Sequence, residues 1–118
     1  MTKVVYGKTY DRFYLEISGH AYSEYGDTEM QSEQDGSEST AVCAAISILA
    51  LSAGQMLGEM DANGEFSSCS ITLDDGYALF DITPSDAEVS GKTEVIFEVL
   101  MGGINYLEEN YPYLVTVE

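Results

Sequence analysis

The stretch that decides the fold is "FSSCSITLDDGYALFDI", residues 66–82. Two runs of alternating apolar and polar residues flank Asp74, Asp75 and Gly76. An Asp-Gly turn between two such runs is a strong signal for a β-hairpin, so we expect two antiparallel strands here. Cys69 falls on the apolar side of the first run, which predicts a thiol packed in the core.

A helix is expected on each side of this hairpin. Residues 39–60 are apolar on nearly every side as far as Ala53, which predicts a buried helix, with Ser39 or Thr40 as its N-cap. Residues 90–111 repeat apolar side chains at helical spacing, which predicts a second helix. The apolar stripe expected on this second helix consists of Val95, Ile96, Val99, Leu100, Ile104 and Leu107.

The remaining strands lie near the two ends of the sequence. Residues 4–6 are β-prone, residues 13–18 alternate strictly, and residues 112–118 favour a short closing strand. The expected order is therefore strand, strand, long loop, helix, strand, strand, helix, strand. For residues 1–118 this order predicts a single α+β domain, in which an antiparallel sheet carries two packed helices.

A polar, acidic segment at about residues 21–39 interrupts this order. It contains Gly26, Gly36 and six carboxylates, and it predicts a long mobile loop of the kind that is usually functional or disordered. The spacing of its acidic residues does not fit an EF-hand, because Gly36 is misplaced relative to Asp27 as the first ligand. We therefore expect no metal site.

The charge of the protein narrows its possible partners. The 118 residues carry a net charge of −17, and no Lys or Arg lies between Arg12 and Lys92. Direct binding to nucleic acid or to an anionic membrane needs cations, so neither is expected, whereas basic proteins would be attracted. We find no signal peptide, and the apolar run at 41–53 is too short to span a membrane. Two cysteines make no disulfide framework, and together these features favour the cytoplasm.

Two chemically capable side chains flank the acidic segment. His20 lies two residues after the alternating strand, at a position that would continue the strand's polar face. Cys43 falls in the first turn of the expected helix. A helix N-terminus and a nearby imidazole both favour a thiolate, and the backbone N–H groups of Cys43 and Ala44 would form an oxyanion hole. These residues therefore make a reasonable acyl-transfer pair. A lone cysteine on an apolar helix is, however, more often a small buried hydrophobe.

Three short stretches resemble a known family. "SGHAYSEYG" at 18–26, "VCAAIS" at 42–47 and "INYLEENYPYLVTVE" at 104–118 are similar to the signature of the ribosomal-processing cysteine proteases called Prp. The resemblance extends over nearly the whole chain in the order and size of the elements. It implies a cytoplasmic endopeptidase that removes the N-terminal extension of a large-subunit ribosomal protein, a basic peptide substrate.

The resemblance also implies residue roles. Cys43 would be the nucleophile and His20 the general base, with a mobile loop between them that orders over the substrate. Tyr22 and Tyr25 are candidates to contact an aromatic substrate residue, and Ser47, one helical turn beyond Cys43, is a candidate to touch the site. The resemblance implies a homodimer and neither a metal nor an organic cofactor.

Two features depart from the family pattern. Thr40 stands where the family has an aspartate, three residues before the cysteine, and the loop after Gly26 is longer. These departures leave a second interpretation open. The chain would then be a catalytically impaired relative that binds basic ribosomal proteins without cleaving them.

Overall fold

Strand β2 lies at the centre of a five-stranded sheet, and it ends beside the candidate site. The computed structural model describes the backbone of residues 1–19 and 33–118 and the side chains of 1–19 and 38–118. The elements are β1 (Thr2–Lys8), β2 (Phe13–Ser18), α1 (Glu33–Ala62), β3 (Phe66–Asp74), β4 (Tyr77–Pro84), α2 (Ala87–Asn110) and β5 (Val115–Val117). Their order confirms the α+β fold expected from the sequence.

The strands lie in the order β3-β4-β2-β1-β5. The pairs β1–β2, β2–β4 and β3–β4 are antiparallel, but β5 pairs with β1 in parallel, with Thr2 opposite Val115. The expectation of an entirely antiparallel sheet is therefore wrong at this edge. The reason is the connection: β4 runs in the direction of β1, and the single helix α2 returns the chain so that β5 runs that way again.

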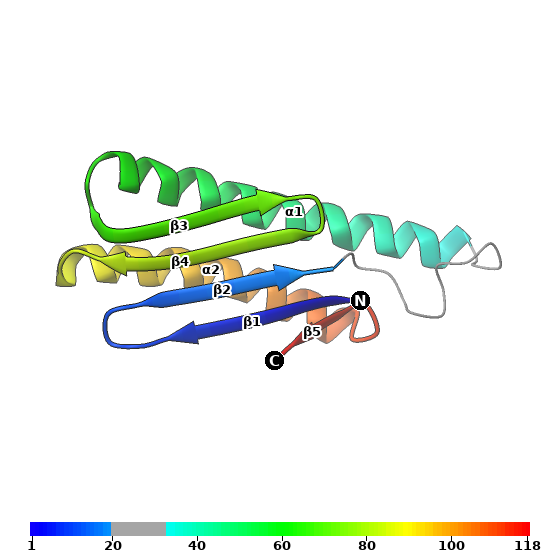
Figure 1. Cartoon of the computed structure of the whole chain (residues 1–118). Helices are drawn as coiled ribbons and strands as arrows, with labels where there is room; N and C mark the ends of the chain where they lie inside the picture. Colours follow the sequence, from blue (N-terminus) through cyan, green and yellow to red (C-terminus); the bar gives the residue numbers. More distant parts are fainter. Residues whose placement is uncertain (20–32) are drawn as a thin grey trace.

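Both helices cover the same face of the sheet, and this face holds the core (Figure 1). The alternation in β2 turns Phe13 inward together with Leu15 and Ile17, and Phe80 on β4 does the same. Phe97 of α2 fills the space between them. Its ring stacks on Phe13 with centroids 5.3 Å apart and meets Phe80 edge-on at 6.2 Å.

Helix α2 begins where Asp86 caps it by accepting a hydrogen bond from the Val89 amide at 2.9 Å. The expected stripe was partly wrong, because Val95 and Val99 are exposed. Val95 and Val99 each lie two positions from the buried Phe97 along α2. Two positions correspond to about 200° around the helix axis, so the burial of Phe97 turns both valines towards solvent. The buried residues of α2 are Val89, Thr93, Phe97, Leu100, Met101, Ile104 and Leu107.

Helix α1 differs from expectation at its start and in its burial. It begins at Glu33, so Ser39 and Thr40 lie inside the helix and neither is the N-cap, and the expected loop at 21–39 ends earlier. It also exposes apolar side chains, Ile48 and Met56 among them, so it is not buried on all sides. Residues Glu38–Ala62 are long and apolar enough to cross a membrane by length and composition alone, a test that core helices of soluble proteins also pass.

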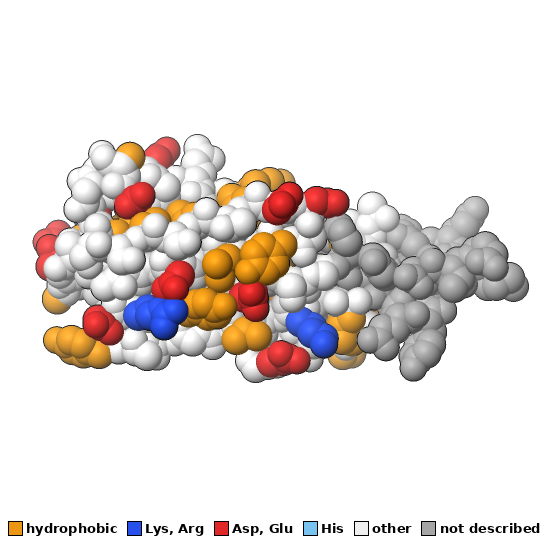
Figure 2. Space-filling model, viewed as in Figure 1, with side chains coloured by type: hydrophobic (Ala, Val, Ile, Leu, Met, Phe, Trp, Pro, Cys, Tyr) orange, Lys and Arg blue, Asp and Glu red, His pale blue; other side chains and the backbone are white. Residues whose placement is uncertain are grey.

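The opposite face of the sheet carries no helix among the described residues. Figure 2 shows acidic and basic side chains scattered among apolar ones on this side. Arg12 and Asp81 form a bidentate ion pair on this face, with Nε–Oδ1 and Nη2–Oδ2 distances of 2.8 and 2.7 Å.

Candidate active site

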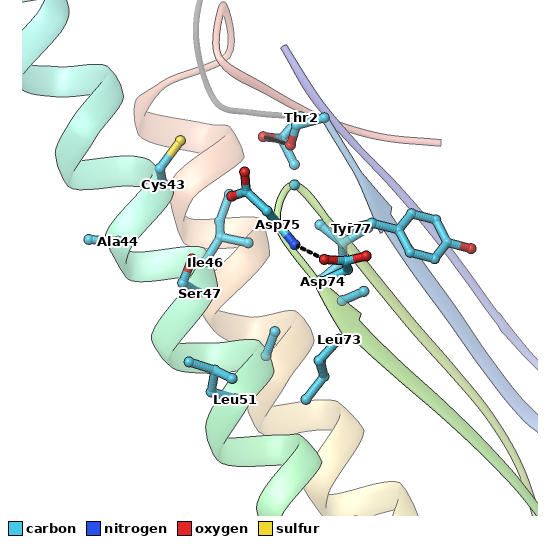
Figure 3. A pocket seen from close by; sticks show the side chains of 15 residues that line it. Thr2, Cys43, Ala44, Ile46, Ser47, Leu51, Leu73, Asp74, Asp75 and Tyr77 are labelled. Carbon is cyan, nitrogen blue, oxygen red and sulfur yellow. Dashed lines mark hydrogen bonds between the residues drawn. The ribbon is translucent and has the colours of Figure 1, made fainter.

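A cavity of about 540 Å³ opens between α1 and the end of the sheet where β2 stops and β3 turns into β4 (Figure 3). Its floor is apolar, and its rim carries the polar groups. The lining residues are Thr2, Ile17, Gly19, Cys43, Ala44, Ile46, Ser47, Ala50, Leu51, Leu73, Asp74, Asp75, Gly76, Tyr77 and Ala78. Three of the residues singled out from the sequence, Cys43, Ala44 and Ser47, are therefore on one wall.

Cys43 reaches this wall because of helical spacing. Its neighbours Val42 and Ile46 are buried against the sheet, which leaves Cys43 half-buried at the edge of the packed face. In Figure 3 its sulfur projects from α1 towards the turn between β3 and β4. The thiol of Cys43 is thus at a cavity wall and not sealed in the core.

The position of Cys43 within α1 corrects one expectation. It lies ten residues after the start at Glu33, not in the first turn. Inside a helix each backbone N–H donates to the carbonyl four residues earlier, so the amides of Cys43 and Ala44 have helical acceptors in this conformation. The helix N-terminus therefore does not act on the Cys43 sulfur as the sequence suggested.

The opposite side of the cavity begins at Gly19, the last described residue before His20. The Gly19 amide donates to the Gly76 carbonyl at 2.8 Å, and its carbonyl accepts from the Thr2 hydroxyl at 3.1 Å. Its φ of +88° favours glycine, and a Cβ here would lie 2.7 Å from the Met1 carbonyl oxygen. His20, Tyr22 and Tyr25 lie outside the described residues.

Among the described residues that line the cavity, the charged ones are Asp74 and Asp75, in the turn between β3 and β4. Asp74 accepts a hydrogen bond from the Asp75 amide at 2.8 Å, while the Asp75 carboxylate is directed towards α1 (Figure 3). Sequence reasoning treated these residues only as a hairpin signal. Asp74 and Asp75 are far from Cys43 in sequence, and only the fold places all three on the same cavity.

Tyr77 closes the cavity beside this turn. Its hydroxyl donates to the Glu16 carboxylate at 2.8 Å, on the outer face of the sheet. That hydrogen bond, with some desolvation, raises the pKa of Tyr77 above its ordinary value. Tyr77 is therefore a neutral wall of the cavity near neutral pH.

The second thiol lies elsewhere. Cys69, on β3, is half-buried and packs against the core, in line with the expectation from its strand. Burial raises the pKa of Cys69, and the charge of Asp61 and a hydrogen bond to it add to this effect. Of the two cysteines, only Cys43 lines the cavity.

No group of three or more His, Cys, Asp or Glu side chains within the described residues is arranged to hold a metal ion. What this part of the chain assembles is a thiol and two carboxylates around an apolar cavity. A thiol on the wall of an apolar cavity is a group that could act as a nucleophile once it is deprotonated.

Three solved structures share this fold. SMU.848 from Streptococcus mutans is 26% identical, with a TM-score of 0.61 and coverage of 100% of this chain and 96% of that one. An essential ribosomal processing protease Prp from S. aureus, in complex with a covalently linked product peptide, is 18% identical, with a TM-score of 0.62 and coverage of 100% and 98%. The same protease with a substrate peptide is 16% identical, with a TM-score of 0.61 and coverage of 100% and 98%.

No curated protein matches the chain. The family model of the cysteine protease Prp, in contrast, matches residues 1–116. This match spans the sheet except for Val117, both helices and every described residue that lines the cavity. The chain therefore belongs to the cysteine protease Prp family.

Proposed function

We propose that this protein is a cysteine endopeptidase that removes the N-terminal extension of a large-subunit ribosomal protein. The observation that carries the proposal is the placement of Cys43 on a cavity whose facing side starts at Gly19, the residue before His20. Consecutive Cα atoms are about 3.8 Å apart, so the backbone of His20 starts from a residue that lines the same cavity.

In the proposed reaction His20 takes the proton of the Cys43 thiol, and the sulfur attacks the scissile carbonyl carbon. His20 then gives that proton to the leaving amine as the peptide bond breaks, which leaves a thioester on Cys43. Water, deprotonated by His20, hydrolyses the thioester and regenerates the thiol. Neither a metal nor an organic cofactor is needed for any of these steps.

If the Cys43 and Ala44 amides stabilise the oxyanion, α1 must change its conformation just before Cys43. Those N–H groups become available only if the residues ahead of Cys43 leave the helix when the substrate binds. Ser47 lines the cavity one turn further along and is a candidate to contact the substrate, as are Tyr22 and Tyr25 in the segment that the sequence predicts to be a loop.

The charge of the protein favours a basic substrate. The net charge is −17, and none of the described residues that line the cavity is Lys or Arg. Three of the four basic side chains form ion pairs: Lys8 with Glu94, Arg12 with Asp81 and Lys92 with Glu65. We propose that the protein works in the cytoplasm on a basic ribosomal precursor, without binding nucleic acid or a membrane directly.

We also propose that the protein is a homodimer that pairs through the outer faces of its helices. Ile48 and Met56 on α1 and Val99 and Tyr106 on α2 are each more than half exposed, the last two at 67% and 64%. Removing such side chains from water gives about 25 cal/mol per Å² of apolar area, and a second copy offers the same surface. Sedimentation equilibrium of Val99→Glu against Glu109→Gln tests this: only the former should be monomeric.

The decisive experiment is cleavage of a ribosomal precursor with its N-terminal extension, followed by intact mass. Wild-type protein should release the extension at a single bond, Cys43→Ala should release none, and Cys69→Ala should match wild type. Equal products from Cys43→Ala and wild type would refute the assignment. The rate of cleavage should also fall as ionic strength rises, because attraction to a basic substrate is screened.

One observation favours a second function, binding of basic ribosomal proteins without cleavage. Cys43 lies well inside α1, away from the amides at the helix N-terminus, which is a poor arrangement for an oxyanion hole. Alkylation distinguishes the two functions. An active protease should be alkylated by iodoacetamide at Cys43 far faster than at Cys69 near pH 6–7, and His20→Ala should remove the difference.

A further inference from the structure

Strand β3 forms one edge of the sheet, and its outer side carries backbone groups that β4 does not use. Asp74 and Tyr77 pair across the two-residue turn, and hydrogen-bonded pairs alternate along an antiparallel ladder. The backbone N–H and C=O groups of Cys69, Ile71 and Leu73 therefore point away from β4. Because β3 is the last strand on this side, no strand among the described residues pairs with these groups (Figure 1).

The two edges of the sheet differ in how they are protected. Edge strands usually avoid pairing with other chains by being short or by carrying lysine, proline or a bulge. The edge strand β5 has three residues, and the Val117 amide donates to the Glu108 carboxylate at 2.6 Å. Strand β3 has nine residues, and from Ser68 to Leu73 it carries no charge, no proline and no shift of register. Within the described part of the chain, β3 is therefore the edge that can accept an added strand.

Helix α1 runs beside this edge and leaves room for the side chains of an added strand. A Cβ on Gly54 would lie 2.8 Å from Leu73 Cδ1, whereas a Cβ on Gly58 would meet no atom within 4 Å. Gly58 lies one turn after Gly54 and so on the same side of the helix. Further along α1, Asp61 forms a hydrogen bond with Cys69. Alternate side chains of a strand added to β3 would therefore face the open space at Gly58.

The charge around the edge indicates what kind of strand it would bind. Exposed carboxylates lie at both ends, with Asp61 near Cys69 and with Asp74 and Asp75 at the turn. The elements that frame the edge, α1, β3 and β4, contain no Lys or Arg. A segment rich in lysine or arginine would thus be attracted to this edge, and an acidic segment would be repelled.

The β3 edge also leads to the thiol, because Leu73 and Asp74, the last two residues of β3, line the same cavity as Cys43. We propose that this edge is the docking strand for an extended, basic segment of the polypeptide substrate, which adds to the sheet beside β3. The inference rests on the proposed function and extends it to how the substrate is held. Main-chain groups of the segment pair with those of Cys69, Ile71 and Leu73, and its basic side chains supply selectivity.

The first test is residue-resolved hydrogen exchange, measured by NMR with the extended ribosomal precursor and the Cys43→Ala variant, so that cleavage does not interfere. Binding should slow exchange of the Cys69, Ile71 and Leu73 amides by at least about tenfold, because each gains an acceptor. The Val117 amide, on the opposite edge of the sheet, should keep its rate within about twofold.

The second test is a matched pair of lysine variants in the same Cys43→Ala background. Gly58→Lys and Gly91→Lys change the net charge equally, and a Cβ at either position would meet no atom within 4 Å, but Gly91 lies on α2. We expect Gly58→Lys to weaken binding of the precursor by at least about tenfold and Gly91→Lys by less than about twofold. Thermal unfolding verifies that both variants remain folded.

Three results would overturn the proposal: no binding of the precursor, binding without slower exchange of the three β3 amides, and equal weakening by the two lysine variants. The proposed function is judged separately. If the precursor binds and slows exchange along β3 but wild type does not cleave it, the protease assignment fails and the docking edge stands. If wild type cleaves the precursor while exchange along β3 is unchanged, the docking edge alone fails.

Discussion

Gly19 offers the sharpest test of how the site is held in place, because two glycines in the chain have similar backbone angles and different surroundings. Gly19 has φ +88° and Gly64 has φ +75°. A Cβ on Gly19 would lie 2.7 Å from the Met1 carbonyl oxygen, whereas a Cβ on Gly64 would have no atom within 4 Å. Alanine at either position is strained by the left-handed backbone conformation, and only alanine at Gly19 also meets the backbone of Met1, just before β1.

The expected losses of stability follow from these two contributions. The left-handed conformation costs an alanine about 1–2 kcal/mol, so Gly64→Ala should lower the free energy of unfolding by about that amount. Overpacking against a backbone atom adds about 1–3 kcal/mol, so Gly19→Ala should lose about 2–5 kcal/mol. Because both variants gain the same reduction of unfolded-state entropy, the difference between them isolates the contact with Met1.

Urea unfolding of both variants, followed by far-UV circular dichroism, measures this difference. If Gly19→Ala and Gly64→Ala lose the same free energy within about 0.5 kcal/mol, the close approach of β1 to Gly19 is wrong. We also expect Gly19→Ala to cleave more slowly than Gly64→Ala at equal folded fraction, because the residue after Gly19 is His20.

Three further predictions concern the core, the ion pair and the second thiol. Phe97→Ala should lower the free energy of unfolding by about 3–5 kcal/mol, measured by urea titration, because its fully buried ring packs on three other aromatic rings. The hydrogen bond from Arg12 lowers the pKa of Asp81, so the ion pair stabilises the fold above the ordinary aspartate pKa. This contribution to the free energy of unfolding is lost as the pH falls through the lowered pKa. The stability of Arg12→Met should lack this acid dependence, and carboxyl NMR would show the titration of Asp81. Asp61→Asn should speed alkylation of Cys69 at pH 8, since the Asp61 charge helps to raise the pKa of that thiol; an unchanged rate, read by peptide mass, would contradict this.

The parts of the fold that depend on local pattern could be predicted from the sequence. The alternation in residues 13–18 and the Asp-Gly turn in residues 66–82 correctly gave the faces of β2 and the hairpin of β3 and β4. In α2 the apolar run around Phe97 fits more than one stripe, and only packing on Phe13 selects the observed face. The parallel pairing of β5 depends on where α2 returns the chain, which no local pattern contains.

Only part of the candidate site could be predicted from the sequence. Cys43 lines the cavity, and its role as the nucleophile stays a prediction. Its expected place in the first helical turn was wrong, because the polar residues 33–38 extend α1 without an apolar signal. The roles of His20, Tyr22 and Tyr25 stay predictions. Asp75 was missed because its closeness to Cys43 comes from the tertiary fold and not from spacing along the chain.

The pairing of β1 with β5 has a consequence for when the protein matures. Thr2 lines the cavity and holds Gly19, yet its own amide depends on Leu114, more than a hundred residues later. During translation β1 is synthesised early, but its pairing with β5 forms last. Closing so long a loop is slow compared with forming a local hairpin. A nascent chain would therefore contain the Cys43 thiol long before the cavity around that thiol is complete.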